Sequence, residues 1–255
     1  MKQLENNAIV VTGAGAGIGA TIAQELAKAG ARVAIADINL DAAAAVARQI
    51  NESDGVALAL QMDVTNREST KAAFERAAQE FGQLEVVFNN AGISQGKDFL
   101  DITPEDWNKM MNVNGLGTLI GMQEAARIFI RQGNGGKIIN TTSVAARQAN
   151  ATFAHYAASK AVVSSLIQSG ARSFAAHNIT VMGFAPGIVV TDMWRKMQPD
   201  EETLNNKMAE YSSRILRNRV STPEDIAPTA VFLAGPGSDY MTGQVIMIDG
   251  GMALV

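Results

Sequence analysis

Short apolar runs recur along this 255-residue chain and alternate with longer stretches of amphipathic helical pattern. Such runs are typical of strands buried on both faces, and their alternation with helices predicts a parallel sheet covered on both sides. Right-handed crossovers favour a doubly wound order, so the predicted fold class is α/β. We predict seven strands, near Ala8–Thr12, Arg32–Asp37, Ala57–Met62, Leu84–Asn89, Lys137–Thr142, Thr180–Ala185 and Val245–Asp249.

Helical patterns fill the intervals, and one interval breaks the rhythm. Examples of the helices are Ile18–Ala29, Arg67–Phe81, Trp107–Arg131, Tyr156–Ala176 and Glu224–Ala234. Nothing linker-like divides the chain, and repeated β/α units often reach this length as one domain, so residues 1–255 are expected to form a single domain. The polar stretch Arg195–Asn206 is the exception, and 188–215 is either a flap over a site or a surface excursion.

Composition excludes several classes of function. The net charge of −4 and the absence of a dense Lys/Arg stripe argue against nucleic-acid binding. No cysteine and only two histidines, His155 and His177, argue against a disulfide framework, a thiolate nucleophile and a metal site. No apolar stretch reaches the roughly 18 residues of a membrane helix, and the first residues lack the apolar part of a signal peptide. We expect a soluble, cytoplasmic protein.

A glycine-rich segment, TGAGAGIG, follows the first predicted strand and opens a helix. Glycines allow a tight turn and let backbone N–H groups approach a diphosphate at the helix N-terminus. Its register stays open, since Gly15-x-Gly17 fits the general dinucleotide fingerprint and Gly13-x-x-x-Gly17-x-Gly19 fits a variant with a wider first gap. The predicted contacts are Gly13, Gly15, Ala16, Gly17, Ile18 and Gly19.

Acidic residues end the second and third predicted strands. Asp37 lies about twenty residues after the glycine segment, where a carboxylate can bind the adenosine ribose hydroxyls and would repel the 2′-phosphate of NADP. Ala16 and Ile38 stand where a cation could neutralise that phosphate, so NAD is favoured over NADP. Asp63 and Val64 are expected to contact the adenine by the same topology.

Tyr156 and Lys160 form the segment YAASK, one helical turn apart. At this spacing the phenol and the ammonium project from one face of a helix. A free tyrosine titrates near pKa ~10, and a cation beside it favours the phenolate. The pair is therefore a candidate general acid and base, with a lowered phenol pKa.

These segments, taken in order, resemble the short-chain dehydrogenase/reductase family over essentially the whole chain. The matching segments are TGxxxGxG at Thr12–Gly19, NNAG at Asn89–Gly92, Asn114 in MNVNG, Ser143 thirteen residues before Tyr156, Lys160, Pro186-Gly187 with Thr191, and DGG at Asp249–Gly251.

The resemblance implies a Rossmann-type domain with a catalytic tetrad of Asn114, Ser143, Tyr156 and Lys160. Tyr156 would be the acid/base, helped by Lys160 and a cationic nicotinamide, Ser143 would orient the substrate oxygen, and Lys160 with Asn114 would relay the proton. Further cofactor contacts implied by the family are Asn90, Ala91, Gly92, Tyr156, Lys160, Pro186, Gly187, Val189 and Thr191. Family members are commonly homotetramers.

The substrate is expected to be neutral, because the residues predicted to surround it offer no Arg or Lys to clamp an anion. Ser143, Tyr156, Gln95 and Asn150 are the predicted contacts. The segments PGIVVTDMW and SDYMTGQ resemble the acetoin reductase/2,3-butanediol dehydrogenase and polyol dehydrogenase branch, which implies a diol, a hydroxyketone or a polyol.

Four alternatives stay open at this point, one of which is a steroid dehydrogenase of the same family. A 3-oxoacyl-(acyl-carrier-protein) reductase is the nearest, although such enzymes usually use NADPH. A protein that binds NAD without catalysis is another. The segment Gly92–Gly96 reads GxSxG, as in a hydrolase nucleophile elbow, but the residues after it do not predict an immediate helix.

Overall fold

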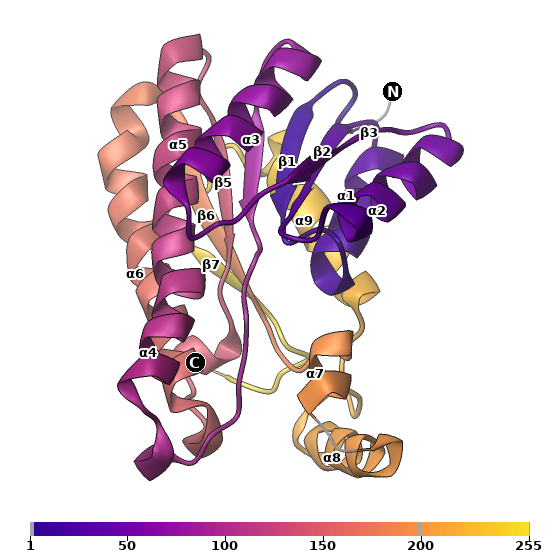
Figure 1. Ribbon diagram of the computed structural model, residues 1–255, viewed down its shortest axis with the longest axis vertical. Coiled ribbons are helices and arrows are strands. Elements are labelled where there is room, and N and C mark those ends of the chain that lie inside the picture. Colours follow the sequence, from indigo (N-terminus) through magenta and orange to yellow (C-terminus); the bar gives the residue numbers. More distant parts are fainter. Residues whose placement is uncertain (1–2, 198–199, 255) are drawn as a thin grey trace.

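A computed structural model describes residues 3–197 and 200–254 and has one seven-stranded sheet, drawn in Figure 1. All neighbouring strands run parallel, in the order β3-β2-β1-β4-β5-β6-β7. The predicted α/β class, the single domain and the seven strands are confirmed. The strands are β1 (Ala8–Thr12), β2 (Arg32–Asp37), β3 (Val56–Gln61), β4 (Val86–Asn89), β5 (Gly136–Thr141), β6 (Ile179–Pro186) and β7 (Val245–Ile248).

Helices cover both faces of this sheet, so the molecule has three layers (Figure 1). One face carries α3 (Arg67–Phe81), α5 (Gly117–Gln132) and α6 (Ala154–Phe174). The other carries α1 (Gly17–Lys28), α2 (Leu40–Glu52) and α9 (Pro223–Ala234).

The two faces follow directly from the alternation of side chains along each strand. In β1, Ile9 and Val11 pack into the core on the α1 side, whereas Ala8 and Val10 pack into the core on the α3 side. Strands that bury both faces in this way read as continuous apolar runs. The prediction from sequence therefore rested on the right physical signal.

The chain reverses its direction of winding between β1 and β4, which are neighbours at the centre of the sheet. In doubly wound folds a ligand binds outside the carboxyl ends of the strands at such a switch point. These ends lie toward the bottom of Figure 1, where α4 (Pro104–Met110), α7 (Asp192–Met197) and α8 (Glu201–Arg214) also lie.

The helix predicted at Trp107–Arg131 is not continuous. It begins earlier, at Pro104, and a π-helical turn over Met111–Leu116 separates α4 from α5. Thr103 caps α4 through a capping box with Asp106, and Thr222 does the same for α9 with Asp225, so both N-terminal threonines act as caps. The π turn was not predicted, because one extra residue in a helix does not visibly change the spacing of its apolar residues.

Residues 188–215 form α7 and α8 rather than an irregular excursion; residues 198–199 of this range lie outside the described residues. Leu204, Met208 and Tyr211 of α8 are buried against partly buried neighbours, which are Ile188, Val190, Trp194, Val220 and Met252. This small apolar cluster is separate from the two cores of the sheet. It gives 188–215 a packing of its own beside the carboxyl ends of the strands.

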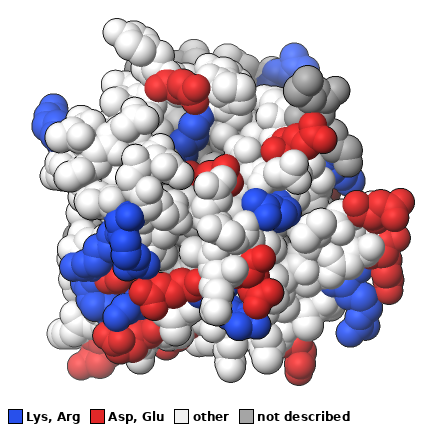
Figure 2. Space-filling model, turned by 90° about the horizontal axis from the view of Figure 1, so that it is seen from above, with Lys and Arg blue, Asp and Glu red and all other residues white. Residues whose placement is uncertain are grey.

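Figure 2 shows the opposite end of the molecule, at the amino ends of the strands. Acidic and basic side chains of the described residues are intermingled on that face. Within the described residues, no helix is both long and apolar enough to pass through a membrane.

Candidate active site

The glycine segment forms a tight loop between β1 and α1. Gly13 and Gly17 have φ of 63° and 56°, a conformation that favours glycine. A side chain at Gly19 would meet the Gly13 carbonyl oxygen at 2.4 Å, so the loop closes on its own backbone. Ala16 is the N-cap residue of α1 and offers no side-chain cap, which leaves the first N–H groups of α1 to another acceptor.

Asp37, at the end of β2, reaches this loop. Its Oδ2 accepts a hydrogen bond from the Gly15 N–H at 2.9 Å, and its Oδ1 accepts one from the Asn39 N–H at 2.9 Å. A carboxylate has further lone pairs for ribose hydroxyls after these two bonds. Ile38 is 67% exposed beside it and carries no charge. The carboxylate therefore both orders the loop and keeps a negative charge at its rim.

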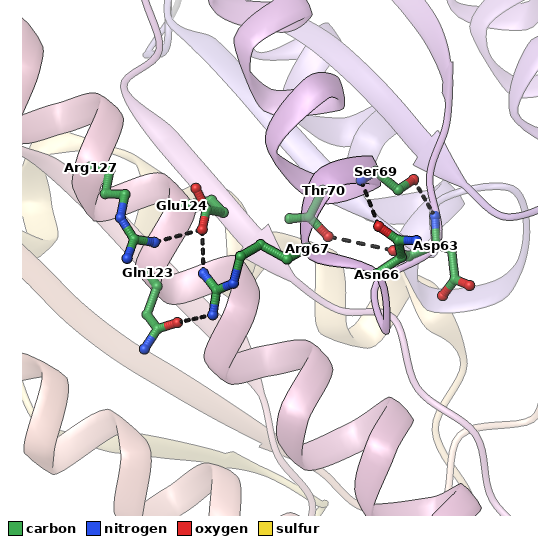
Figure 3. Close-up of polar contacts among 8 residues, drawn as sticks. All are labelled: Asp63, Asn66, Arg67, Ser69, Thr70, Gln123, Glu124 and Arg127. Atoms are coloured by element: carbon green, nitrogen blue, oxygen red, sulfur yellow. Dashed lines mark hydrogen bonds and ion pairs between the residues drawn. The ribbon is translucent and has the colours of Figure 1, made fainter.

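The loop after β3 is held by its own side chains, as Figure 3 shows. The Ser69 hydroxyl accepts a hydrogen bond from the Asp63 N–H at 3.0 Å, and the Asp63 carboxylate accepts from the N–H and hydroxyl of Thr65 at 2.9 and 2.8 Å. Val64 packs on α5 at Gly117, where an added Cβ would lie 3.0 Å from the valine side chain. Asp63 and Val64, which are predicted to contact the adenine, thus lie on a loop that packs against α5.

An ion-pair cluster joins the start of α3, which follows this loop, to α5 (Figure 3). The buried Glu124 carboxylate accepts from Arg67 and, at 2.6 Å, from Arg127. Arg67 also donates to the Gln123 side chain at 2.6 Å. Because Arg67 begins α3, this cluster fixes α3 against α5.

Asn90 joins the end of β4 to the glycine loop. Its side chain donates to the Thr12 carbonyl at 3.0 Å and accepts from the Thr141 hydroxyl at 3.2 Å. The Thr12 hydroxyl in turn accepts from the N–H groups of Asn90 and Ala91, both at 3.0 Å. Asn90 therefore connects three strand ends, and Ala91 and Gly92 follow it along the loop.

Ser143, just after β5, and Tyr156, in the first turn of α6, come together at the carboxyl edge of the sheet. The Ser143 hydroxyl is buried, accepts from the Ala145 N–H at 3.2 Å and lies near the Tyr156 phenol. Burial raises the pKa of Tyr156, and the hydrogen bond with Ser143 opposes that rise. The phenol therefore stays protonated near neutral pH.

Lys160 lies one turn along α6, and its side chain is almost fully buried. Its ammonium donates to the Thr141 carbonyl at 2.9 Å and lies 5.9 Å from the centre of the Tyr156 ring. Burial lowers the pKa of Lys160 to about 8. The predicted net lowering of the Tyr156 pKa is wrong for the protein groups alone, because burial outweighs the groups that favour the phenolate.

Asn114, in the π turn, uses its side chain as a bridge. Its amide oxygen accepts from the Ile93 N–H at 2.9 Å, and its amide nitrogen donates to the Ile93 carbonyl and the Ser159 hydroxyl, both at 2.9 Å. A Cβ at Gly92 would lie 3.1 Å from this amide and 3.4 Å from the Lys160 ammonium. The glycine thus lets Asn114 and Lys160 approach the loop after β4.

The segment after β6 runs back over the glycine loop. Gly187 donates to the Ile248 carbonyl at 3.0 Å, and a side chain there would meet the Asp249 backbone at 2.9 Å. Val189 is buried and forms a bridge with Ser221. The Thr191 methyl lies 3.5 Å from the position of a Cβ at Gly17. Pro186 to Thr191 therefore lies over the proposed dinucleotide site.

The two predicted polar substrate contacts are exposed. Gln95 is exposed, and the Asn150 side-chain oxygen is engaged by the N–H and hydroxyl of Thr152, both at 3.0 Å. Gly92–Gly96 is irregular and leads to a short 3-10 turn at Phe99, not to a helix, so the nucleophile-elbow alternative is wrong.

Three polar residues support the site but were not singled out from sequence. Thr12 holds Asn90 and Ala91, Thr141 receives the Lys160 ammonium, and Ser159 receives the Asn114 amide. Their positions at strand ends or beside Lys160 could have indicated a role in the site. Buried Ser and Thr residues are so common, however, that position alone does not distinguish these three.

Comparisons with known proteins identify the family of the chain. A family model described as enoyl-(acyl carrier protein) reductase matches residues 13–253. An L-2,3-butanediol dehydrogenase of Corynebacterium glutamicum is 39% identical over 250 residues, which is 95% of this chain and 97% of that protein. A sorbitol dehydrogenase of Cereibacter sphaeroides is 36% identical over 254 residues, 98% of each chain.

A solved structure of a 7α-hydroxysteroid dehydrogenase, complexed with NADH and 7-oxoglycochenodeoxycholic acid, superposes with a TM-score of 0.89. It is 34% identical, and the match covers 98% of this chain and 95% of that one. The match extends over nearly the whole of both chains, as do those to the two relatives. This chain therefore belongs to the short-chain dehydrogenase/reductase family and is an oxidoreductase of that family.

Proposed function

We propose that the protein interconverts a neutral secondary alcohol and a ketone, using NAD(H). The observation that carries the proposal is the buried ammonium of Lys160, 5.9 Å from the centre of the Tyr156 ring, with the buried Ser143 hydroxyl near the phenol, at the carboxyl edge of the sheet. This arrangement offers a proton donor at an oxygen and a cation to favour the phenolate once the proton has left.

In ketone reduction, Tyr156 gives its phenolic proton to the substrate oxygen, which Ser143 holds. Lys160 then favours the phenolate until the proton returns through the buried polar groups near Thr141 and Asn114. Because its raised pKa keeps Tyr156 protonated, reduction is favoured near neutral pH and oxidation at higher pH.

The residues present fit a dinucleotide, which supplies hydride transfer when bound. The uncapped N-terminus of α1 and the glycine loop suit a diphosphate, and Asp37 suits ribose hydroxyls. Asp37 with neutral Ala16 and Ile38 disfavours a 2′-phosphate, so we propose NAD rather than NADP. The remaining contacts proposed are Asp63, Val64, Asn90 to Gly92, and Pro186 to Thr191.

The proposed substrate is a diol, a hydroxyketone or a polyol. The names of the C. glutamicum and C. sphaeroides relatives support this class. We also propose that the protein is cytoplasmic and a homotetramer. Leu116, at the end of the π turn, and Ile130 of α5 are exposed apolar side chains on the helical segment that flanks β5, which supports the assembly. Residues 188–215 are proposed to border the substrate.

A substrate panel tests the proposal directly. It contains acetoin, butanediol stereoisomers, a hexitol, a pentitol and a 3-oxoacyl thioester, each assayed with NAD(H) and NADP(H). We expect turnover of a neutral substrate, with at least ~10-fold higher kcat/KM for NAD(H). Turnover of the thioester alone, with NADPH, would instead identify a 3-oxoacyl reductase.

Tyr156→Phe separates catalysis from binding alone. We expect kcat/KM to fall by ~10³-fold or more while NADH affinity, measured by fluorescence titration, stays within about threefold. Tyr240→Phe is the matched control, because Tyr240 is fully exposed, and its activity should equal wild type. Activity that survives in Tyr156→Phe would contradict the mechanism.

A further inference from the structure

A polar cavity lies at the amino ends of β4, β5 and β6, at the end of the molecule that Figure 2 shows. Its volume is about 350 Å³, whereas a water molecule occupies about 30 Å³ in the liquid, so a small organic molecule fits inside. Asn7, Asn134 and Asn178 lie in its wall, and the described part of the wall contains none of the proposed catalytic or dinucleotide-binding residues. We call it the amino-end cavity.

The lysine in this wall, Lys137, is already neutralised and fully used. Its ammonium donates to the Gly235 carbonyl at 2.5 Å, to the Ser238 hydroxyl at 3.0 Å and to the Asp239 carboxylate at 2.6 Å. An ammonium has three N–H donors, so none remains for a ligand. The described residues of the wall therefore offer no free cation to an anionic molecule.

Glu85 carries a negative charge that no cation neutralises within residues 3–197 and 200–254. Its carboxylate accepts from the Ala8 N–H and, at 2.7 Å, from the Gln83 amide. Both donors are neutral, and a carboxylate has about four lone-pair sites, so about two remain for further N–H donors. Because Lys137 is matched by Asp239, Glu85 leaves the wall with an excess of negative charge.

The ends of three helices add to this negative potential. The wall includes Gln132 and Ala234, the last residues of α5 and α9, and Gln83, which follows the C-cap residue of α3. The last carbonyl groups of a helix carry roughly half a negative charge. The amino-end cavity thus favours a positively charged molecule.

The hydroxyl of Thr180 is the feature that points most directly to a ligand. Thr180 lines the cavity, and its hydroxyl oxygen is buried without a hydrogen-bond partner in the described part of the chain. It lies opposite Lys137 in the register of β5 and β6, beside an ammonium whose donors are all used. A buried hydroxyl without a partner costs stability, and an N–H donor in the cavity would satisfy it.

We infer that the amino-end cavity is a second binding site, and that it takes a small organic ammonium. The N–H groups of this ligand bind the Glu85 carboxylate and the Thr180 hydroxyl, and its carbon chain lies along Val86 and Ala234. A metal ion fits less well, because the described residues contain no group of three or more His, Asp or Glu side chains that could hold one. The cavity lies at the opposite edge of the sheet from Tyr156, so the inference does not depend on the proposed function.

Three four-carbon probes of different charge test the inference by isothermal titration calorimetry on the whole protein with NADH present. The probes are putrescine, 1,4-butanediol and succinate. We expect one putrescine per chain, bound at least ~10-fold more tightly than the butanediol, and no binding of succinate. Equal binding of the three probes, a preference for succinate, or a cavity that holds only solvent and binds none of them would overturn the inference.

A pair of charge-removing variants separates this site from a general attraction of amines to an acidic protein. Glu85→Gln keeps the shape of the side chain and should weaken putrescine binding ~10-fold or more. Glu105→Gln is the matched control, because Glu105 is an exposed carboxylate on α4, at the other end of the sheet. It should leave putrescine binding within about twofold, and equal losses in the two variants would contradict a specific site.

Thr180→Val distinguishes a binding role from a structural one. It should weaken putrescine binding ~5-fold, yet leave the free energy of unfolding of the ligand-free protein equal or higher, because an unpaired buried hydroxyl is removed. Urea unfolding and calorimetry measure the two parts. A less stable Thr180→Val protein with unchanged putrescine affinity would show that the hydroxyl serves the fold, and would overturn the inference while leaving the proposed function intact.

Discussion

Glu124 and Lys160 are both buried, but their charges are compensated in different ways. Glu124 receives two arginines, Arg67 and Arg127, which neutralise it from the protein surface. The Lys160 ammonium donates to the Thr141 carbonyl, and no carboxylate pairs with it among residues 3–197 and 200–254. One charge lies at the adenine end of the proposed dinucleotide site and the other at its reactive end.

The buried charge of Glu124 thus has a structural role, whereas that of Lys160 has a chemical one. A neutralised carboxylate can fix two helices without any change in protonation. A buried ammonium without a counter-charge has a lowered pKa. It gains a partner when the phenol beside it ionises, and so it favours that ionisation. Each contrast between the two residues can be measured.

The largest expected effect is on activity at Lys160. Lys160→Met should lower kcat/KM by ~10²–10⁴-fold, because the phenolate loses its cation. Its free energy of unfolding should stay within about 1 kcal/mol of wild type or rise, since a buried charge without a counter-charge is removed. Steady-state kinetics and urea unfolding check the two parts.

Lys137→Met is the matched control for this substitution. Lys137 is also mostly buried, but it pairs with Asp239 at 2.6 Å at the other end of the sheet. The control should lose stability and keep kcat/KM within about threefold. If both lysine variants lost activity alike, the contrast drawn between paired and unpaired charges would be wrong.

The next effect is on the pH dependence of stability. The folded pKa of Lys160, about 8, lies below the ordinary value of 10.5. Below pH 8 both states carry the proton; from there to pH 10 the unfolded chain binds more protons, so stability rises with pH. Wild type should gain about 2 kcal/mol over this window relative to Lys160→Met.

Urea unfolding of both proteins at several pH values measures this difference. The window ends near pH 10, since the raised pKa of Tyr156 makes the phenol act in the opposite sense at higher pH. Parallel stability curves for the two proteins would contradict the lowered lysine pKa.

The smallest expected effect is at Glu124. Glu124→Gln should cost about 1–2 kcal/mol of stability, less than for a fully buried pair, because both arginines are partly exposed. Activity should stay within about threefold. Glu75→Gln is the control: Glu75 pairs with Arg131 at 3.5 Å on the surface, and its loss should cost less than ~0.5 kcal/mol.

The sheet could be predicted because its signal is local. Runs such as Ile9 to Val11 bury both faces, and the residues that follow each strand meet at one edge of a parallel sheet. Hence the positions of Asp37, Asn90 and Ser143 relative to one another followed from the order of the strands alone.

The directions of the site side chains could not be predicted in this way. The sequence places Lys160 beside Tyr156 but does not say that its ammonium turns to Thr141, a contact made across the fold. The contact between the rings of Phe153 and Trp194 joins segments about forty residues apart, so no spacing rule reveals it.

The π turn at Met111–Leu116 constrains how this region can change in length. Each residue of an α-helix turns the chain by about 100°, so deleting one residue here would rotate α4 against α5 by that angle. Asn114 would then lose its reach to Ile93 and Ser159 together. We expect evolution to keep Asn114 in this turn and to tolerate no single-residue insertion or deletion there.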